Sequence, residues 1–197
     1  MVHASMRRLG PVEGRADGVI EAILGAIAPG GTMLMVLGAR DDHAWVNERP
    51  EDEREALLAD AEPFDALRTP AQPDVGTLAE VFRRYPGTVV SDHPEGRFAA
   101  HGALAHELLD DVPWNDYFGA GSPLERLAAE GRILRLGADL DTVTALHHAE
   151  YRCSVWPKRR VRRYRRIATP QGSPIPVSYT HLTLPTMRLR CRSRWSP

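Results

Sequence analysis

The chain has 197 residues, 43% of them hydrophobic, which suffices for one globular domain with a sizeable core. No stretch approaches the roughly 18 uninterrupted apolar residues of a membrane helix, and polar residues follow Met1 where a signal peptide would be apolar. We therefore expect a cytoplasmic protein without a membrane partner. The two cysteines, Cys153 and Cys191, have no metal-site spacing and form no disulfide framework.

The last 21 residues differ in character from the rest. Residues 177–186 back-translate to GTC TCT TAT ACA CAT CTG ACG CTG CCG ACG, which resembles a transposon end used in library preparation, and residues 191–197 fit the outer adapter. We therefore predict a native domain over residues 1–176 and a non-native, disordered tail over residues 177–197. A natural basic tail is the alternative.

The charge is unevenly distributed. The tail carries four arginines and no acid, so 21 basic and 26 acidic residues remain without it, a formal net charge of −5. Seven of these basic residues lie between residues 157 and 166, and residues 1–156 carry a formal net charge of −12. An acidic surface attracts cationic small molecules and repels nucleic acid.

Strand and helix patterns alternate in the N-terminal part. Residues 1–5 predict a strand, and apolar residues at helical spacing predict a helix over residues 19–27 that Pro29-Gly30-Gly31 ends. The continuously apolar run 32–37 predicts a strand buried on both faces, and this order indicates an α/β fold. The polar residues 39–73 predict a functional lid or a disordered segment.

The middle of the chain continues the pattern. We predict helices over residues 75–85 and about 101–109, with a short strand at 88–91 between them and an aromatic loop after the second helix. Ser122-Pro123-Leu124-Glu125 combines a capping hydroxyl, a proline at the first helical position and a reciprocal carboxylate, so a helix begins there. Residues 133–136 predict a buried strand.

The segment from Asp141 to Glu150 carries the densest chemistry. We predict a helix capped by Asp141, which places His147 and Glu150 on one face, three residues apart. This pair suits proton transfer, although it is also common as a plain surface pair. His148 points about 100 degrees away from His147, so we predict a packed residue rather than a second zinc ligand.

Several motifs occur in an order that resembles the aminoglycoside 3-N-acetyltransferase family. The motifs are Gly10-Pro11-Val12-Glu13-Gly14, residues 29–35, Ser91-Asp92-His93-Pro94, Gly121-Ser122-Pro123-Leu124, and residues 136–144 running into His147-His148-Ala149-Glu150. The resemblance covers residues 1–176, and Pro63-Phe64-Asp65 is similar to the branch that acts on gentamicin- and apramycin-like drugs. Asp139 and Arg135 depart from the family pattern, in which members begin earlier and continue past Pro176.

The resemblance implies an α/β fold with a mixed central sheet, distinct from the GCN5-related acetyltransferase fold. It implies acetyl transfer from acetyl-coenzyme A to the 3-amino group of a 2-deoxystreptamine aminoglycoside, conferring antibiotic resistance, with no metal. His147 matches the family's catalytic position as the general base. Glu150 is expected to orient His147 or to pair with a substrate ammonium.

The resemblance also suggests binding residues. His3, Ser5 and Arg7 match the early strand and loop near coenzyme A, where hydroxyls, backbone amides and an arginine can hold a pyrophosphate. His93 is a further candidate for cofactor binding, or a turn residue. Asp41 is a candidate for gripping a substrate ammonium, or a solvated loop residue.

Two alternatives stay open. The basic run over residues 158–166, with Tyr164 interleaved, resembles a phosphate-binding patch and suggests a nucleic-acid-binding module. The second alternative is that the chain is an inactive, truncated fragment of the enzyme, with exposed sheet edges that would favour aggregation. The sequence gives neither the oligomeric state nor the range of aminoglycosides.

Overall fold

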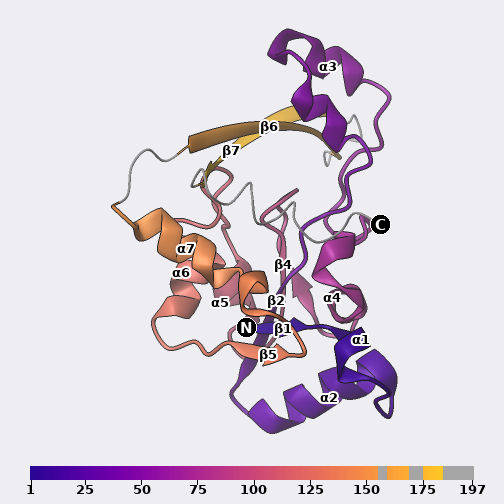
Figure 1. Ribbon diagram of the computed structural model, residues 1–197, viewed down its shortest axis with the longest axis vertical. Helices are drawn as coiled ribbons and strands as arrows, with labels where there is room; N and C mark the ends of the chain where they lie inside the picture. The colour runs from indigo at the N-terminus through magenta and orange to yellow at the C-terminus, as the bar shows by residue number, and fades with distance from the viewer. Residues whose placement is uncertain (155–158, 169–174, 184–197) are drawn as a thin grey trace.

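A small central sheet organises the chain in the computed structural model, which describes residues 1–154, 159–168 and 175–183 (Figure 1). Strand β2 (Thr32–Val36) pairs antiparallel with β4 (Phe98–Gly102), which pairs antiparallel with β3 (Val89–Val90). A second, parallel pair joins β1 (Val2–Ala4) to β5 (Leu134–Leu136). Parallel and antiparallel pairing together confirm the predicted mixed α/β class.

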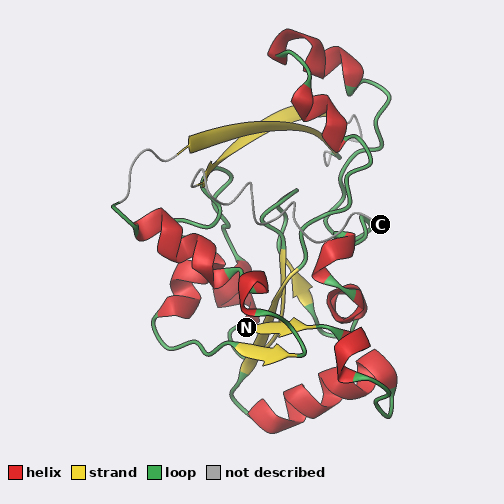
Figure 2. Cartoon of the chain, in the orientation of Figure 1, coloured by secondary structure: helices red, strands yellow, loops and turns green. Residues whose placement is uncertain are grey.

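Helices cover both faces of the β2-β4-β3 sheet (Figure 2). On one face lie α2 (Arg15–Ile27) and α4 (Thr77–Arg83), with the short α1 (Met6–Leu9) beside them. On the other face lie α5 (Ala105–Leu109) and α6 (Pro123–Ala128), and α7 (Ala145–Arg152) contacts α6. The result is a three-layer arrangement of helices, sheet and helices.

The residues of β2 explain this layering. Successive strand residues point to opposite faces, so Met33 and Met35 enter the core under α2 and α4, whereas Leu34 enters the core under α5 and α6. All three side chains are at most 2% exposed. An uninterrupted apolar run is therefore what this position requires, and the predicted strand over residues 32–37 is confirmed.

A long hairpin and the polar excursion form the remaining part of the fold. Strands β6 (Arg159–Ile167) and β7 (Ile175–Thr183) pair antiparallel along their whole length. The excursion is ordered into the 3-10 turns η1 (Ala44–Glu48), η2 (Glu51–Glu53) and η3 (Pro73–Val75) and the helix α3 (Arg54–Leu57). A small apolar cluster of Val46, Leu58 and Ala61, with Tyr164 of β6 against it, joins the excursion to the hairpin.

Three predicted elements differ from the structure. The helix expected from about residue 101 begins at Ala105, because Phe98 to Gly102 form the central strand β4. The strand over residues 133–136 is not buried: Ile133 and Leu134 are 46% and 42% exposed. Asp141 does not cap a helix; it lies in the 3-10 turn η4 (Leu140–Thr142), and α7 starts after the extended residue Val143.

The C-terminal tail also differs from its expected disorder where it is described. Residues 177–183 belong to β7, whose main chain pairs with β6, and the Tyr179 side chain is 2% exposed because it packs against His93, Trp114 and Tyr117. Residues 184–197 lie outside the described residues. The non-native origin of the tail stays a prediction.

Candidate functional site

His147 and Glu150 face each other on α7. The imidazole Nδ1 lies 3.4 Å from Glu150 Oε2, and the two side chains are 34% and 23% exposed. A carboxylate beside Nδ1 favours the tautomer that carries its proton there, which leaves the lone pair of Nε2 to accept a proton. The predicted pair on one helical face is thus brought together, partly open to solvent, in a form suited to general-base chemistry.

The loop before α6 packs against the histidines of α7 through Phe118. The ring of Phe118 lies parallel to the His147 imidazole, with ring centroids 4.9 Å apart and planes inclined by 7°. His148 is 5% exposed, and its Nδ1 lies 2.9 Å from the carbonyl oxygen of Phe118. His148 is therefore a packed residue, as predicted, whereas the sequence did not indicate the contact between Phe118 and His147.

The three residues proposed near coenzyme A follow one another along β1 and the turn into α1. His3 is 6% exposed, and burial, with the positive charge of the N-terminus, lowers its pKa from 6.5 to about 4. Ser5 is half-buried, its side chain forms no capping hydrogen bond to α1, and Arg7 is exposed. A hydroxyl and an exposed arginine at this turn fit a phosphate group, whereas the neutral, buried His3 fits a packing role.

The departures from the family pattern meet beside this turn. Asp139 accepts a hydrogen bond from Arg8 at 2.6 Å, and Arg135 donates to the carbonyl oxygen of Ala138. Both charged groups lie at the surface. Neither charge therefore disturbs the packing of the sheet.

His93 has both ring nitrogens engaged within the protein. Its Nδ1 accepts hydrogen bonds from the amides of Glu95 and Gly96, at 3.1 and 2.8 Å, and its Nε2 lies 2.9 Å from the carbonyl oxygen of Trp114. The ring is fully buried among the aromatic rings of Trp114, Tyr117 and Tyr179. This geometry favours the turn-residue interpretation over cofactor binding.

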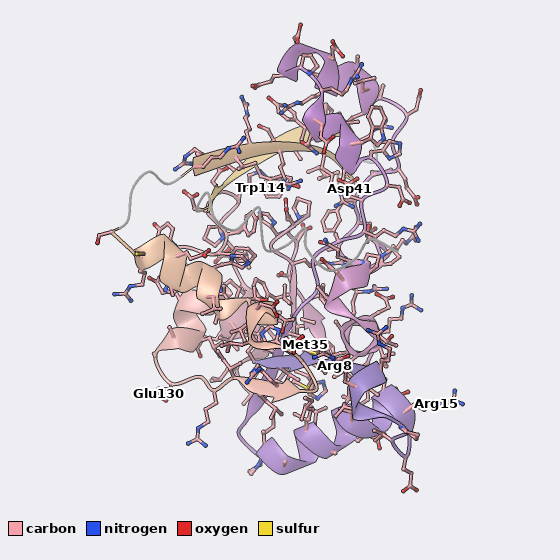
Figure 3. All side chains as sticks on the ribbon, in the orientation of Figure 1. Arg8, Arg15, Met35, Asp41, Trp114 and Glu130 are labelled. Atoms are coloured by element: carbon pink, nitrogen blue, oxygen red, sulfur yellow. The ribbon has the colours of Figure 1, made fainter. Side chains whose placement is uncertain are left out.

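Asp41 and Trp114 both lie beside the β6-β7 hairpin, away from Arg8 (Figure 3). Asp41 Oδ1 accepts the amide of His43 at 3.0 Å, and Oδ2 is 4.0 Å from Arg165. Its side chain is 21% exposed. One carboxylate oxygen is thus used by the loop, and the other faces a buried arginine.

Three arginines of the basic run are paired with carboxylates elsewhere in the described residues. Arg160 pairs with Asp116 at 3.1 Å, Arg162 with Glu51 at 2.6 Å, and Arg163 with Glu95 at 3.4 Å. The charge of Glu95 raises the pKa of Arg163 against the opposing effect of burial. These arginines tie the hairpin to the acidic body, and the nucleic-acid alternative is not favoured.

Arg97 is a structural residue that the sequence did not single out. It is fully buried and donates hydrogen bonds to four main-chain carbonyl groups, those of Gly38, Ala66, Thr69 and Pro70. Burial and the charges of neighbouring arginines lower its pKa to about 10. Arg97 therefore anchors both ends of the excursion that carries Asp41.

A surface cavity lies away from these residues. It has a volume of about 340 Å³ between β3 and the end of α5 and is lined by Val89, Val90, Ser91, Asp92, Leu109, Asp110, Asp111 and Val112. No predicted site residue lines it, so chemistry rather than cavity size identifies the candidate site. Within the part of the chain that the structure describes, no cluster of three or more His, Cys, Asp or Glu side chains could hold a metal ion, and no helix has the length and apolar character of a membrane span.

Known proteins resemble the chain along most of its length. The family model for aminoglycoside 3-N-acetyltransferases matches residues 1–192. An aminoglycoside N(3)-acetyltransferase VIII from Streptomyces fradiae is 40% identical over 190 residues, which cover 88% of this chain and 66% of the relative. A counterpart of type III from Pseudomonas aeruginosa is 36% identical, with 82% of this chain and 60% of the relative covered.

Solved structures agree with the sequence matches. The structure described as AAC-IIIb binary with CoASH superposes with a TM-score of 0.84 at 36% identity, over 93% of this chain and 68% of that one. The structure described as AAC-VIa bound to sisomicin gives a TM-score of 0.81 at 31% identity, with the same coverage. The fold predicted from the resemblance is confirmed, and the chain spans about two thirds of the length of these proteins.

Proposed function

We propose that this chain, which belongs to the aminoglycoside 3-N-acetyltransferase family, transfers an acetyl group from acetyl-coenzyme A to the 3-amino group of a 2-deoxystreptamine aminoglycoside. The observation that carries the proposal is the pair of His147 and Glu150 on α7, which is partly open to solvent and lies in a segment that resembles the family's catalytic motif. The relatives named above support the substrate class through their own names. Because the chain spans about two thirds of their length, the activity is a property to be tested.

His147 serves as the general base in this proposal. An ammonium group has no lone pair with which to attack a thioester, so its proton must first be removed. His147 Nε2 accepts this proton while Glu150 holds Nδ1 at 3.4 Å and stabilises the positive charge that the ring acquires. A positioned base of this kind contributes about 100- to 10,000-fold in rate.

The chain's own charges favour a cationic substrate. Residues 1–156 carry a formal net charge of −12, which raises the local concentration of a polyamine before it reaches the site. Glu150 and Asp41 are the carboxylates that we propose for contacts with substrate ammonium groups. Asp41 would exchange its 4.0 Å contact with Arg165 for such a contact.

Ser5 and Arg7 are the residues that we propose for holding coenzyme A. When bound, acetyl-coenzyme A supplies the thioester whose acyl group is transferred. The Ser5 hydroxyl and the Arg7 guanidinium can hydrogen-bond to a phosphate oxygen at the turn after β1. His3 and His93, also suggested by the resemblance, are buried and would support this turn and the hairpin from within.

Release of free thiol from acetyl-coenzyme A in the presence of gentamicin or apramycin tests the activity. We expect His147→Ala to lower kcat by about 100- to 10,000-fold. His106→Ala is the matched control, because His106 is an exposed histidine on α5 whose side chain is 76% exposed, and this variant should keep the wild-type rate. Absence of turnover from soluble, cooperatively folded chain would contradict the proposal and favour the inactive-fragment alternative.

A further inference from the structure

We propose that the loop from Asp116 to Gly121 is a seat for α7 and that Phe118 is a positioning residue for His147. This inference rests on the proposed function for its kinetic consequence, but its structural content is independent of activity. Three contacts between the loop and α7 carry it, and they lie along one face of the helix, at His147, His148 and Tyr151. We call this loop the α7 seat.

The first contact fixes the plane of the His147 ring. A centroid separation of 4.9 Å and an interplanar angle of 7° place the Phe118 ring flat against the imidazole, within the range in which aromatic pairs attract. Phe118 is itself held from behind, because its ring meets Phe98 of β4 edge-to-face at 6.2 Å and Tyr117 at 4.6 Å. The imidazole therefore rests on a ring anchored to the core of the sheet.

The second contact fixes the rotation of the helix. The carbonyl oxygen of Phe118 accepts a hydrogen bond from Nδ1 of the buried His148, at 2.9 Å. Adjacent residues on a helix point about 100 degrees apart, so one loop residue touches two directions around the α7 axis. A rotation of α7 that kept one of these contacts would break the other.

The third contact lies one turn further along α7. A Cβ atom on Gly119 would lie 2.5 Å from Cε2 of Tyr151, so the loop backbone packs directly against the Tyr151 ring. Gly119 has no positive φ, and therefore it is the close approach, rather than backbone conformation, that requires glycine here. The absence of a side chain at residue 119 lets the helix settle on the loop.

Glu150 alone does not set the direction of the catalytic lone pair. Its contact with Nδ1, at 3.4 Å, is long for a hydrogen bond and leaves the ring free to tilt about that contact. The stack on Phe118 removes this tilt. The two contacts together fix where Nε2 points, and a displacement of about 1 Å at a reacting atom can cost about 100-fold in rate.

Nuclear magnetic resonance of the His147 ring tests the seat without any substrate. In the wild-type chain, the ring current of Phe118 should shift the His147 carbon-bound ring protons upfield, with His147→Ala giving the assignment. Phe118→Leu keeps an apolar side chain of similar size and should abolish this shift, whereas Phe118→Tyr keeps the ring and should retain it. A shift that persists in Phe118→Leu would overturn the proposal.

Kinetics then test the consequence for the reaction. We expect Phe118→Leu to lower kcat by about 10- to 100-fold with little change in KM, and Phe118→Tyr to restore most of the rate. An unchanged kcat in folded Phe118→Leu that has lost the upfield shift would overturn the positioning role. If Phe118→Leu does not fold, Gly119→Ala serves instead, because its methyl group must displace Tyr151 and should reduce both the shift and kcat.

If the wild-type chain shows no turnover, the proposed function fails. The ring-current comparison still decides whether the α7 seat exists.

Discussion

Arg97 offers a quantitative test of how the excursion over residues 39–73 is held on the sheet. Its guanidinium is fully buried and donates to the carbonyl oxygens of Gly38 at 2.7 Å, Ala66 at 3.0 Å, Thr69 at 2.8 Å and Pro70 at 2.9 Å. The same group lies over the Phe64 ring, 5.6 Å from its centroid. In Arg97→Met, an apolar chain of similar length replaces the cation, and these buried acceptors lose their donor.

The expected cost follows from two opposing effects. Each hydrogen bond to a charged group contributes about 1.5–3 kcal/mol to the free energy of unfolding. Burying the guanidinium costs several kcal/mol, so the net contribution of Arg97 is much smaller than the sum of its four hydrogen bonds. A buried acceptor left without its donor typically costs about 1–3 kcal/mol. We therefore expect Arg97→Met to lower the free energy of unfolding by about 3 kcal/mol.

Urea-induced unfolding measures the loss of stability, and limited proteolysis of the native chain shows whether the excursion has loosened. The midpoint should fall in Arg97→Met, and cleavage should appear first within residues 39–73. Arg84→Met is the control: the Arg84 side chain is 65% exposed and pairs with Glu80, so its loss should cost less than about 1 kcal/mol. Equal stability of the two variants would refute the anchoring role of Arg97.

Two further predictions concern a buried histidine and a helix cap. Burial, with the charge of the N-terminus, lowers the pKa of His3 from 6.5 to about 4, so the unfolded chain binds a proton at a higher pH than the folded chain does. Stability should therefore fall by about 2–3 kcal/mol as the pH falls from 6.5 towards 4, and denaturant titrations of His3→Gln should show a smaller loss; parallel pH dependences would contradict this. Ser122→Ala should lower the free energy of unfolding by about 1 kcal/mol, because Ser122 Oγ accepts the amide of Glu125 at the start of α6; an unchanged thermal midpoint would show that the cap contributes nothing.

Local chemistry made parts of the fold predictable. The start of α6 follows from Ser122 and Pro123 alone, and the structure confirms it, with the Glu125 carboxylate reaching the amide of Gly121. The strand over residues 32–37 was equally clear, because both of its faces are apolar. Strand β4 was not predicted, since alanines and a glycine carry little β propensity and only the strands on both sides place Phe98 to Gly102 in the sheet.

The candidate site likewise combines contacts that local sequence predicts with contacts that depend on distant packing. The pairing of His147 with Glu150 follows from a spacing of three residues on a helix, and the structure brings the two together. The contact with Phe118 depends on where a distant loop packs, and 29 residues of sequence separate it from His147. The hydrogen bonds that occupy both nitrogens of His93 likewise arise from a turn and an aromatic cluster that no local pattern specifies.

The hairpin shows why a segment of unusual sequence can still complete the fold. Strand β7 pairs with β6 through its main chain, and it meets the loop before α6 through main-chain groups and through the side chains of Tyr179 and Thr180. The Thr180 carbonyl oxygen accepts the amide of Asp116 at 2.8 Å, and the Ser178 carbonyl oxygen accepts the Trp114 indole at 2.9 Å. Any sequence that forms a strand at this place supplies such acceptors, whereas the buried ring of Tyr179 is specific to this one. The α7 seat is therefore held by main-chain acceptors that many strand sequences could supply, together with the Tyr179 ring, which packs on Tyr117 and is specific to this sequence.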